Sequence, residues 1–172
     1  MPEAAKPGAL YAKAADLLAT TRRGSLASHL ARDDQPDLQP GFPYVSLVLL
    51  APDTDGRPFL LLSDLSEHAQ NLQAKPDLAL LLEQTADKPE PLAEPRLTLL
   101  GDAQVVSDKE EALAMKKRFV EAQPSAEVWA GFGDFRPYRI TWRAAHFVAG
   151  FGRIAWLSPD RLAQELGQRL ER

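Results

Sequence analysis

Three places in the sequence combine residue types that can bind an anion or the edge of a flat ring. At the first, Ser66 and His68 follow the pair Ser63-Asp64 at the end of an apolar run, in the expected first turn of a helix. A helix N-terminus offers free N–H groups and the positive end of the helix dipole, so this position suits a phosphate. The alternative is that Ser66 only caps the helix and that the His68 side chain is solvated.

The second and third places lie at the starts of two expected strands. Arg96 opens an apolar strand, where its forked guanidinium can bind a phosphate or a carbonyl group, or can lie at a solvated strand edge. Residues 41–48 (GFPYVSLV) combine a rigid turn with a β-forming run, and their backbone groups can bond the polar edge of a flat ring. The alternative for this segment is ordinary strand initiation.

No residue pattern for catalysis or for metal binding accompanies these places. His29, His68 and His146 are far apart in the sequence, none has the spacing of a metal site, and there is no cysteine. The serines lie in no nucleophile-elbow pattern. This absence is typical of a protein whose bound cofactor carries the reaction.

Composition and charge narrow the class of protein. The chain has 172 residues, 45% of them apolar and 26% charged, which predicts a single domain over residues 1–172. Its net charge of −4 argues against a broad nucleic-acid surface, because phosphate contacts need a clustered basic face. No apolar run approaches the roughly 18 residues of a membrane span, and the N-terminal segment does not resemble a signal peptide. We therefore expect a soluble cytoplasmic protein with no nucleic-acid or membrane partner.

The elements that must position these residues are strands in hairpin order with helices between them. Periodicity and turn residues predict strands over 25–32, 44–51, 58–62, 78–83, 96–106 and 138–143, and helices over 8–23, 66–75, 107–123 and 158–172. A capping box at Ser107 is expected to open the third helix. Bends are expected at Gly101 and, in a terminal strand, at residues 150–156. This order predicts an α+β fold with an antiparallel barrel or a strongly coiled sheet.

Five segments follow one another between about residues 10 and 157. They are residues 23–28 (RGSLAS), 41–48 (GFPYVSLV), 61–72 (LLSDLSEHAQNL), 95–101 (PRLTLLG) and 150–153 (GFGR). Their order and spacing resemble those of the pyridoxamine 5′-phosphate oxidase-like, FMN-binding split-barrel proteins, and most closely the branch related to haem-utilisation proteins. The resemblance implies a six-stranded antiparallel split β-barrel with flanking helices, a homodimer, and FMN held in clefts at the dimer interface.

The resemblance also implies which residues contact FMN. They are Tyr44, Val45 and Ser46 on one strand, Ser63 and Asp64 at the ring and ribityl chain, His68 at the phosphate, and Arg96 as a further polar contact. The implied function is an FMN-dependent oxidoreductase of unknown substrate. One alternative is a non-catalytic module that binds flavin or haem for utilisation, storage or sensing. Another is a dimeric scaffold whose cleft has lost its cofactor.

The sequence departs from this family's pattern in three respects. The true pyridoxamine phosphate oxidases carry Arg-Lys where this chain has Glu67-His68, so we expect modest FMN affinity. The arginine and histidine that bind the substrate phosphate in those oxidases have no match near the C-terminus, so that activity is not expected. Haem-degrading relatives use a histidine in a C-terminal extension, whereas the last histidine here is His146. We expect that ligand to be missing.

Overall fold

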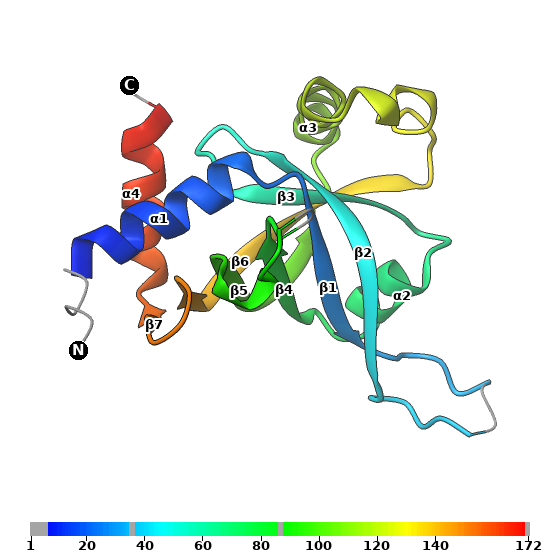
Figure 1. The fold of residues 1–172 in the computed structure, drawn as a ribbon. Helices are drawn as coiled ribbons and strands as arrows, with labels where there is room; N and C mark the ends of the chain where they lie inside the picture. Colours follow the sequence, from blue (N-terminus) through cyan, green and yellow to red (C-terminus); the bar gives the residue numbers. More distant parts are fainter. Residues whose placement is uncertain (1–6, 35–36, 86–87, 171–172) are drawn as a thin grey trace.

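The computed structural model describes residues 7–34, 37–85 and 88–170, which form a barrel of strands with helices at its ends and beside it (Figure 1). The helices are α1 (Pro7–Thr20), α2 (Glu67–Ala74), α3 (Lys109–Ala122) and α4 (Pro159–Leu170), with short 3-10 helices η1 (Pro91–Ala93) and η2 (Pro124–Val128). The strands are β1 (Arg23–His29), β2 (Pro43–Pro52), β3 (Pro58–Ser63), β4 (Asp77–Glu83), β5 (Arg96–Val105), β6 (Phe135–Val148) and β7 (Ile154–Leu157). None of the helices in the described ranges has the length and apolar character needed to span a membrane.

The strands form one antiparallel sheet in the order β3-β2-β1-β4-β5-β6-β7. β3 also pairs with β6, for example Leu60 with Tyr138, and this pairing closes β1 to β6 into a barrel. The predicted six-stranded antiparallel barrel with flanking helices is therefore confirmed. Residues 150–156 do more than bend a strand. The chain turns at Gly150, where φ is 100°, and returns as β7 to extend the sheet beyond β6.

β5 has an irregularity at Gly101, where the sequence predicts a bend. The register between β5 and β6 shifts between Leu100 and Gly101. A Cβ atom at Gly101 would lie 2.0 Å from the carbonyl oxygen of Thr141, so only glycine allows the two strands to approach this closely. A bulge of this kind increases the local twist of a strand pair, which helps a sheet to close.

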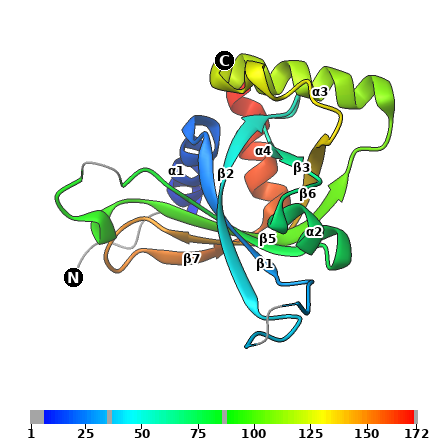
Figure 2. The same ribbon diagram turned by 90° about the vertical axis from the view of Figure 1, so that its right-hand side faces the viewer.

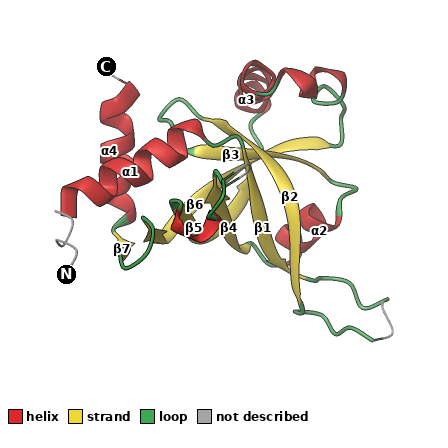
Figure 3. Cartoon of the chain, viewed as in Figure 1, coloured by secondary structure: helices red, strands yellow, loops and turns green. Residues whose placement is uncertain are grey.

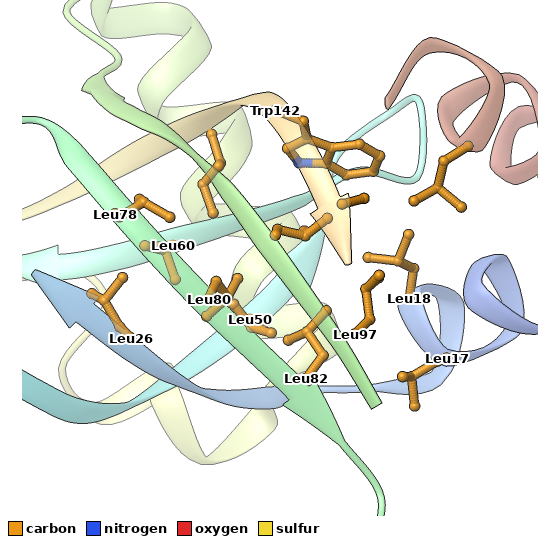
Figure 4. Packing of buried hydrophobic residues seen from close by; sticks show 14 of the residues in the cluster. Leu17, Leu18, Leu26, Leu50, Leu60, Leu78, Leu80, Leu82, Leu97 and Trp142 are labelled. Atoms are coloured by element: carbon orange, nitrogen blue, oxygen red, sulfur yellow. The ribbon is translucent and has the colours of Figure 1, made fainter. Parts of the chain in front are cut away.

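The barrel interior is filled by leucines that alternate with outward-pointing residues along each strand. Leu26, Leu60, Leu80 and Leu97 are completely buried there (Figure 4). Each fully buried leucine side chain contributes about 1.5–3 kcal/mol relative to an exposed one. The interior is therefore a packed core, and any ligand must bind outside it or at its ends.

α1 and α4 lie together at one end of the barrel, and Figure 3 shows α2 and the hairpin of β1 and β2 at the other. Leu17 and Leu18 of α1 join the barrel core. The Tyr11 hydroxyl accepts a hydrogen bond from the backbone N–H of Ser158 at 2.9 Å. The Arg161 guanidinium lies over the ring of Tyr11, 4.3 Å from its centroid. The β1–β2 hairpin projects from the barrel as an arm in a second view as well (Figure 2).

α3 covers a second apolar cluster on the outside of the barrel. In it the rings of Phe59 and Phe119 meet edge to face, with centroids 5.8 Å apart. Asp53, in the turn between β2 and β3, accepts hydrogen bonds from Arg118 of α3 at 2.8 Å and from Arg139 of β6 at 2.9 Å. The side chain of Asp53 is only 9% exposed, so these ion pairs tie α3 to the barrel.

The starts of two helices test the capping predictions. The Ser66 hydroxyl accepts a hydrogen bond from the N–H of Ala69 at 3.4 Å and caps α2, as predicted. The capping box at Ser107 is wrong by one residue, because Asp108 caps α3 by accepting a hydrogen bond from Glu111 N at 2.8 Å. An aspartate at this position also adds a negative charge near the positive end of the helix dipole.

Candidate functional site

The end of β3 places Ser63 and Asp64 beside the start of β6, where their side chains bond to their own chain. The Ser63 hydroxyl donates to the carboxylate of Asp134. Oδ1 of Asp64 accepts from Arg136, 2.9 Å from Nε and 2.7 Å from Nη2, and from the side-chain amide of Gln73 at 2.9 Å. These bonds hold α2 and β6 together at this end of the barrel. A cofactor contact at Ser63 or Asp64 would use backbone groups or exchange one of these partners.

His68 lies in the first turn of α2, as the sequence predicts, and is half-buried. Burial lowers the pKa of its imidazole from the ordinary value of 6.5, because desolvation disfavours the charged form. The preceding Glu67 forms an ion pair with Arg32 at 2.9 Å, which offsets its negative charge at the helix start. A phosphate bound here would oppose the effect of burial on the His68 pKa, because it favours the charged imidazole.

Tyr44, Val45 and Ser46 alternate across β2, so they do not all face one site. Val45 points to the outside of the sheet and is 63% exposed. Tyr44 lines a hollow of about 350 Å³ together with Leu30, Arg32, Leu38, Phe42, Pro43 and Glu67. The Ser46 hydroxyl is buried and has no hydrogen-bond partner among the described residues. Tyr44 and Ser46 therefore share one side of β2, and Val45 belongs to a different surface.

Arg96 lies at the far end of the barrel from these residues. Ser63 pairs with Phe135, the first residue of the 14-residue strand β6, whereas Arg96 pairs with Val148, the last. The Arg96 guanidinium donates a hydrogen bond to the carbonyl oxygen of Leu92 at 2.9 Å. Within one copy of the chain, Arg96 and the start of α2 therefore lie at opposite ends of the barrel.

The outer face of the sheet is apolar and exposed across β2, β1, β4, β5, β6 and β7. Cross-strand pairs join Leu47 to Ser25, Ser25 to Leu81, Leu81 to Thr98, Thr98 to His146 and His146 to Trp156. Side chains at its two edges are strongly exposed: Leu47 by 70%, Ile154 by 62% and Trp156 by 66%. We call this surface the open face, made by Ser25, Ala27, Val45, Leu47, Ala79, Leu81, Arg96, Thr98, Leu100, Ala144, His146, Ile154 and Trp156. Polar outward residues at the ends of β1 and β4 complete it, namely Arg23, His29, Asp77 and Glu83.

His146 lies on the open face, and the sequence did not mark it as a site residue. Its neighbours Ala145 and Phe147 are completely buried in the barrel, so the alternation of the strand turns His146 outward. Its ring lies against the indole of Trp156 on β7, with centroids 4.7 Å apart. Arg96 is two residues from Thr98, the cross-strand partner of His146, and points to the same face. Arg96 therefore lies on the same face as His146 and at the opposite end of the barrel from His68.

Three comparisons place this structure among known proteins. "Non-canonical heme oxygenase HOZ, chloroplastic" of Arabidopsis thaliana is 36% identical over 146 residues, which cover 85% of this chain and 43% of that protein. The chain therefore spans less than half the length of that relative. A solved haem-binding protein from Mycobacterium smegmatis is 26% identical with a TM-score of 0.76, over 95% of this chain and 61% of the other. HutZ, a haem storage protein from Vibrio cholerae, shares the fold with a TM-score of 0.61 at 22% identity, over 77% of this chain and 89% of its own.

A family model settles the classification. The model described as "CREG, beta-barrel" matches residues 8–163, nearly the whole of the described barrel with α1 and the start of α4. This match confirms the resemblance to split-barrel proteins of the haem-utilisation branch that the sequence motifs indicated. The chain belongs to the CREG β-barrel family.

Proposed function

We propose that this chain is a split-barrel module that binds haem, or in second place a flavin, and that a second copy of the chain covers the bound cofactor. The names of similar proteins support haem, because the relative from A. thaliana is a haem oxygenase and the M. smegmatis structure is a haem-binding protein. The observation that carries the proposal is the open face, a continuous surface over six strands with mainly small and aliphatic side chains at its centre. Extended apolar surface of this kind is typical of a binding site.

The residues of the open face fit haem well. A haem combines a flat apolar macrocycle with two carboxylates, and the face offers aliphatic side chains, the indole of Trp156 and the guanidinium of Arg96. In the described ranges no group of three or more histidine or acidic side chains could hold a bare metal ion. A haem iron needs only an axial ligand from the protein. Bound haem would supply a redox-active iron, while the protein would bind it, orient it and exclude water.

FMN is the second candidate, and the start of α2 favours it. There the Ser66 cap and the half-buried His68 lie at the positive end of a helix, where a phosphate is stabilised. In the first half of β2, the hydroxyl of Ser46 has no hydrogen-bond partner among the described residues and could bond to a bound cofactor. With FMN bound, the protein would act as an oxidoreductase of unknown substrate. Because Arg96 lies at the opposite end of β6, any Arg96 contact in this site would come from the second copy.

The homodimer is part of the proposal because the open face is too exposed and apolar for a lone chain. Val45 and Leu47 are 63% and 70% exposed on β2, although neither is in a loop. In a twofold dimer each contact occurs twice, so burying a few exposed aliphatic side chains contributes strongly to the free energy of association. Cytoplasmic localisation and the lack of nucleic-acid partners remain predictions from the sequence.

Titration of the purified protein with hemin, FMN and riboflavin tests the proposal. We expect hemin to bind with a shifted Soret band, and light scattering to give a mass near twice 18.9 kDa. Binding of FMN without binding of hemin would favour the second candidate. If neither hemin nor FMN bound, the proposed function would be wrong, and a monomer at micromolar concentration would exclude the covering second copy.

A further inference from the structure

We propose that His146 is the axial ligand of the haem iron. This inference rests on the proposed function, and it names the one side chain that would bond to the metal. Of the other two histidines of the chain, His29 also points outward from β1, at the end of that strand, and His68 lies in the first turn of α2.

The imidazole of His146 is free to bind a metal. It points outward from β6 between two completely buried neighbours, and it is half-buried by the side chains around it. No hydrogen bond joins either of its ring nitrogens to another described residue. His29 differs, because its Nδ1 lies 3.4 Å from the carbonyl oxygen of Gly41. His146 is therefore a nitrogen donor on the open face whose bonding capacity the described residues do not use.

Two neighbours of His146 on the open face have short side chains. On the β5 side its cross-strand partner is the short side chain of Thr98, and two residues back along β6 the outward side chain is Ala144. A side chain that stands up from a sheet would hold a metal above the sheet, and these short neighbours would not obstruct it.

Trp156 is the positioning residue in this arrangement. Its indole lies 4.7 Å from the His146 ring, centroid to centroid, with the ring planes tilted by 48°. This contact restricts rotation of the imidazole, so less conformational freedom is lost when the iron binds.

Arg96 supplies a positive charge that could bind a haem carboxylate. In the antiparallel register it pairs with Val148, so it lies diagonally across from His146, within the reach of a long side chain. Its cross-strand partner on β4 is Glu83, but no ion pair joins Arg96 to another described residue, and its guanidinium donates to the carbonyl oxygen of Leu92. A haem carboxylate at this edge would accept a charge-assisted hydrogen bond from Arg96.

Hemin complexes of the full chain and of single-residue variants test the ligand assignment by absorbance and electron paramagnetic resonance spectra. We expect the wild-type protein and the control His29→Ala to give the same histidine-ligated spectrum. His146→Ala should lose that spectrum and bind hemin about 10- to 100-fold more weakly, since loss even of an outer-sphere partner of a metal ligand costs this much. Imidazole added to the His146→Gly complex should restore the spectrum.

The outcomes separate the ligand assignment from the proposed function. If His146→Ala kept the wild-type spectrum and affinity, His146 would not be the ligand, although haem binding itself would stand. If the wild-type protein bound no hemin, this inference and the haem part of the proposed function would both be wrong. Circular dichroism and thermal melting of the cofactor-free variants confirm that they fold, because glycine in a strand costs only about 0.5–1 kcal/mol. Loss of the spectrum in a folded His146→Ala supports the assignment.

Discussion

Leu47→Ala should weaken the homodimer strongly. Leu47 lies on the open face with 70% of its side chain exposed in one copy, so at about 0.8 kcal/mol per buried methylene the loss of three carbons costs roughly 1.7 kcal/mol. A twofold interface contains this contact twice, so the substitution lowers the association free energy of the dimer by about 3.4 kcal/mol. Since 1.4 kcal/mol is a factor of ten, the dimer dissociation constant should rise roughly 300-fold.

Sedimentation equilibrium over a dilution series measures this constant directly. The matched control is Leu113→Ala, which makes the same change at a residue of α3 that is 56% exposed and lies outside the open face. We expect the control to dimerise like the wild type. An unchanged dissociation constant in a folded Leu47→Ala would refute the placement of the second copy on the open face.

Three further changes test other parts of the structure. Gly101→Ala should lower the melting temperature, because the overpacking costs about 1–3 kcal/mol, whereas the control Gly131→Ala has open space and should change it little. Asp53→Asn should cost about 1–2 kcal/mol of unfolding free energy in urea, because the two arginines that it bridges lose their carboxylate while staying partly solvated. The pKa of His68 is lowered in the folded state, so below about pH 6.5 the unfolded chain takes up a proton that the folded chain resists. Unfolding free energy should therefore fall from pH 7 toward pH 5, and His68→Gln should show a smaller fall; equal slopes would contradict this account.

Local signals in the sequence were enough to predict most of the elements and the class of barrel. The cap at Ser66 and the irregularity at Gly101 depend on residues a few positions away or on the special freedom of glycine, so they are visible in the chain itself. β7 was not predicted as a separate strand, because its four residues are too few for a periodic pattern and it exists through its pairing with β6. The same holds for the closing pair of β3 and β6, which the family resemblance implied and local patterns did not.

The site was harder to predict than the fold because it depends on register. The sequence indicated both His68 and Arg96 as site residues. No local pattern shows that, within one copy, His68 lies near the start of β6 and Arg96 beside its end. Arg96 shares a face with His146 because β5 and β6 pair in the register that puts Thr98 opposite His146. A shift of one residue would have turned His146 into the barrel and Phe147 outward. The predicted flavin contacts at Tyr44, Ser63 and Asp64 remain predictions.

The packing of α1 on α4 has a consequence for how the protein is made. The hydrogen bond between Tyr11 and Ser158 joins residues 147 positions apart, and α4 follows every other described element in the chain. At about 5–20 residues per second, α1 waits roughly 7–30 s on the ribosome before its partner helix is synthesised. During that interval the side of α1 that will contact α4 stays uncovered. Docking of the two helices is therefore among the last steps of folding, because α4 is synthesised after all the strands of the barrel.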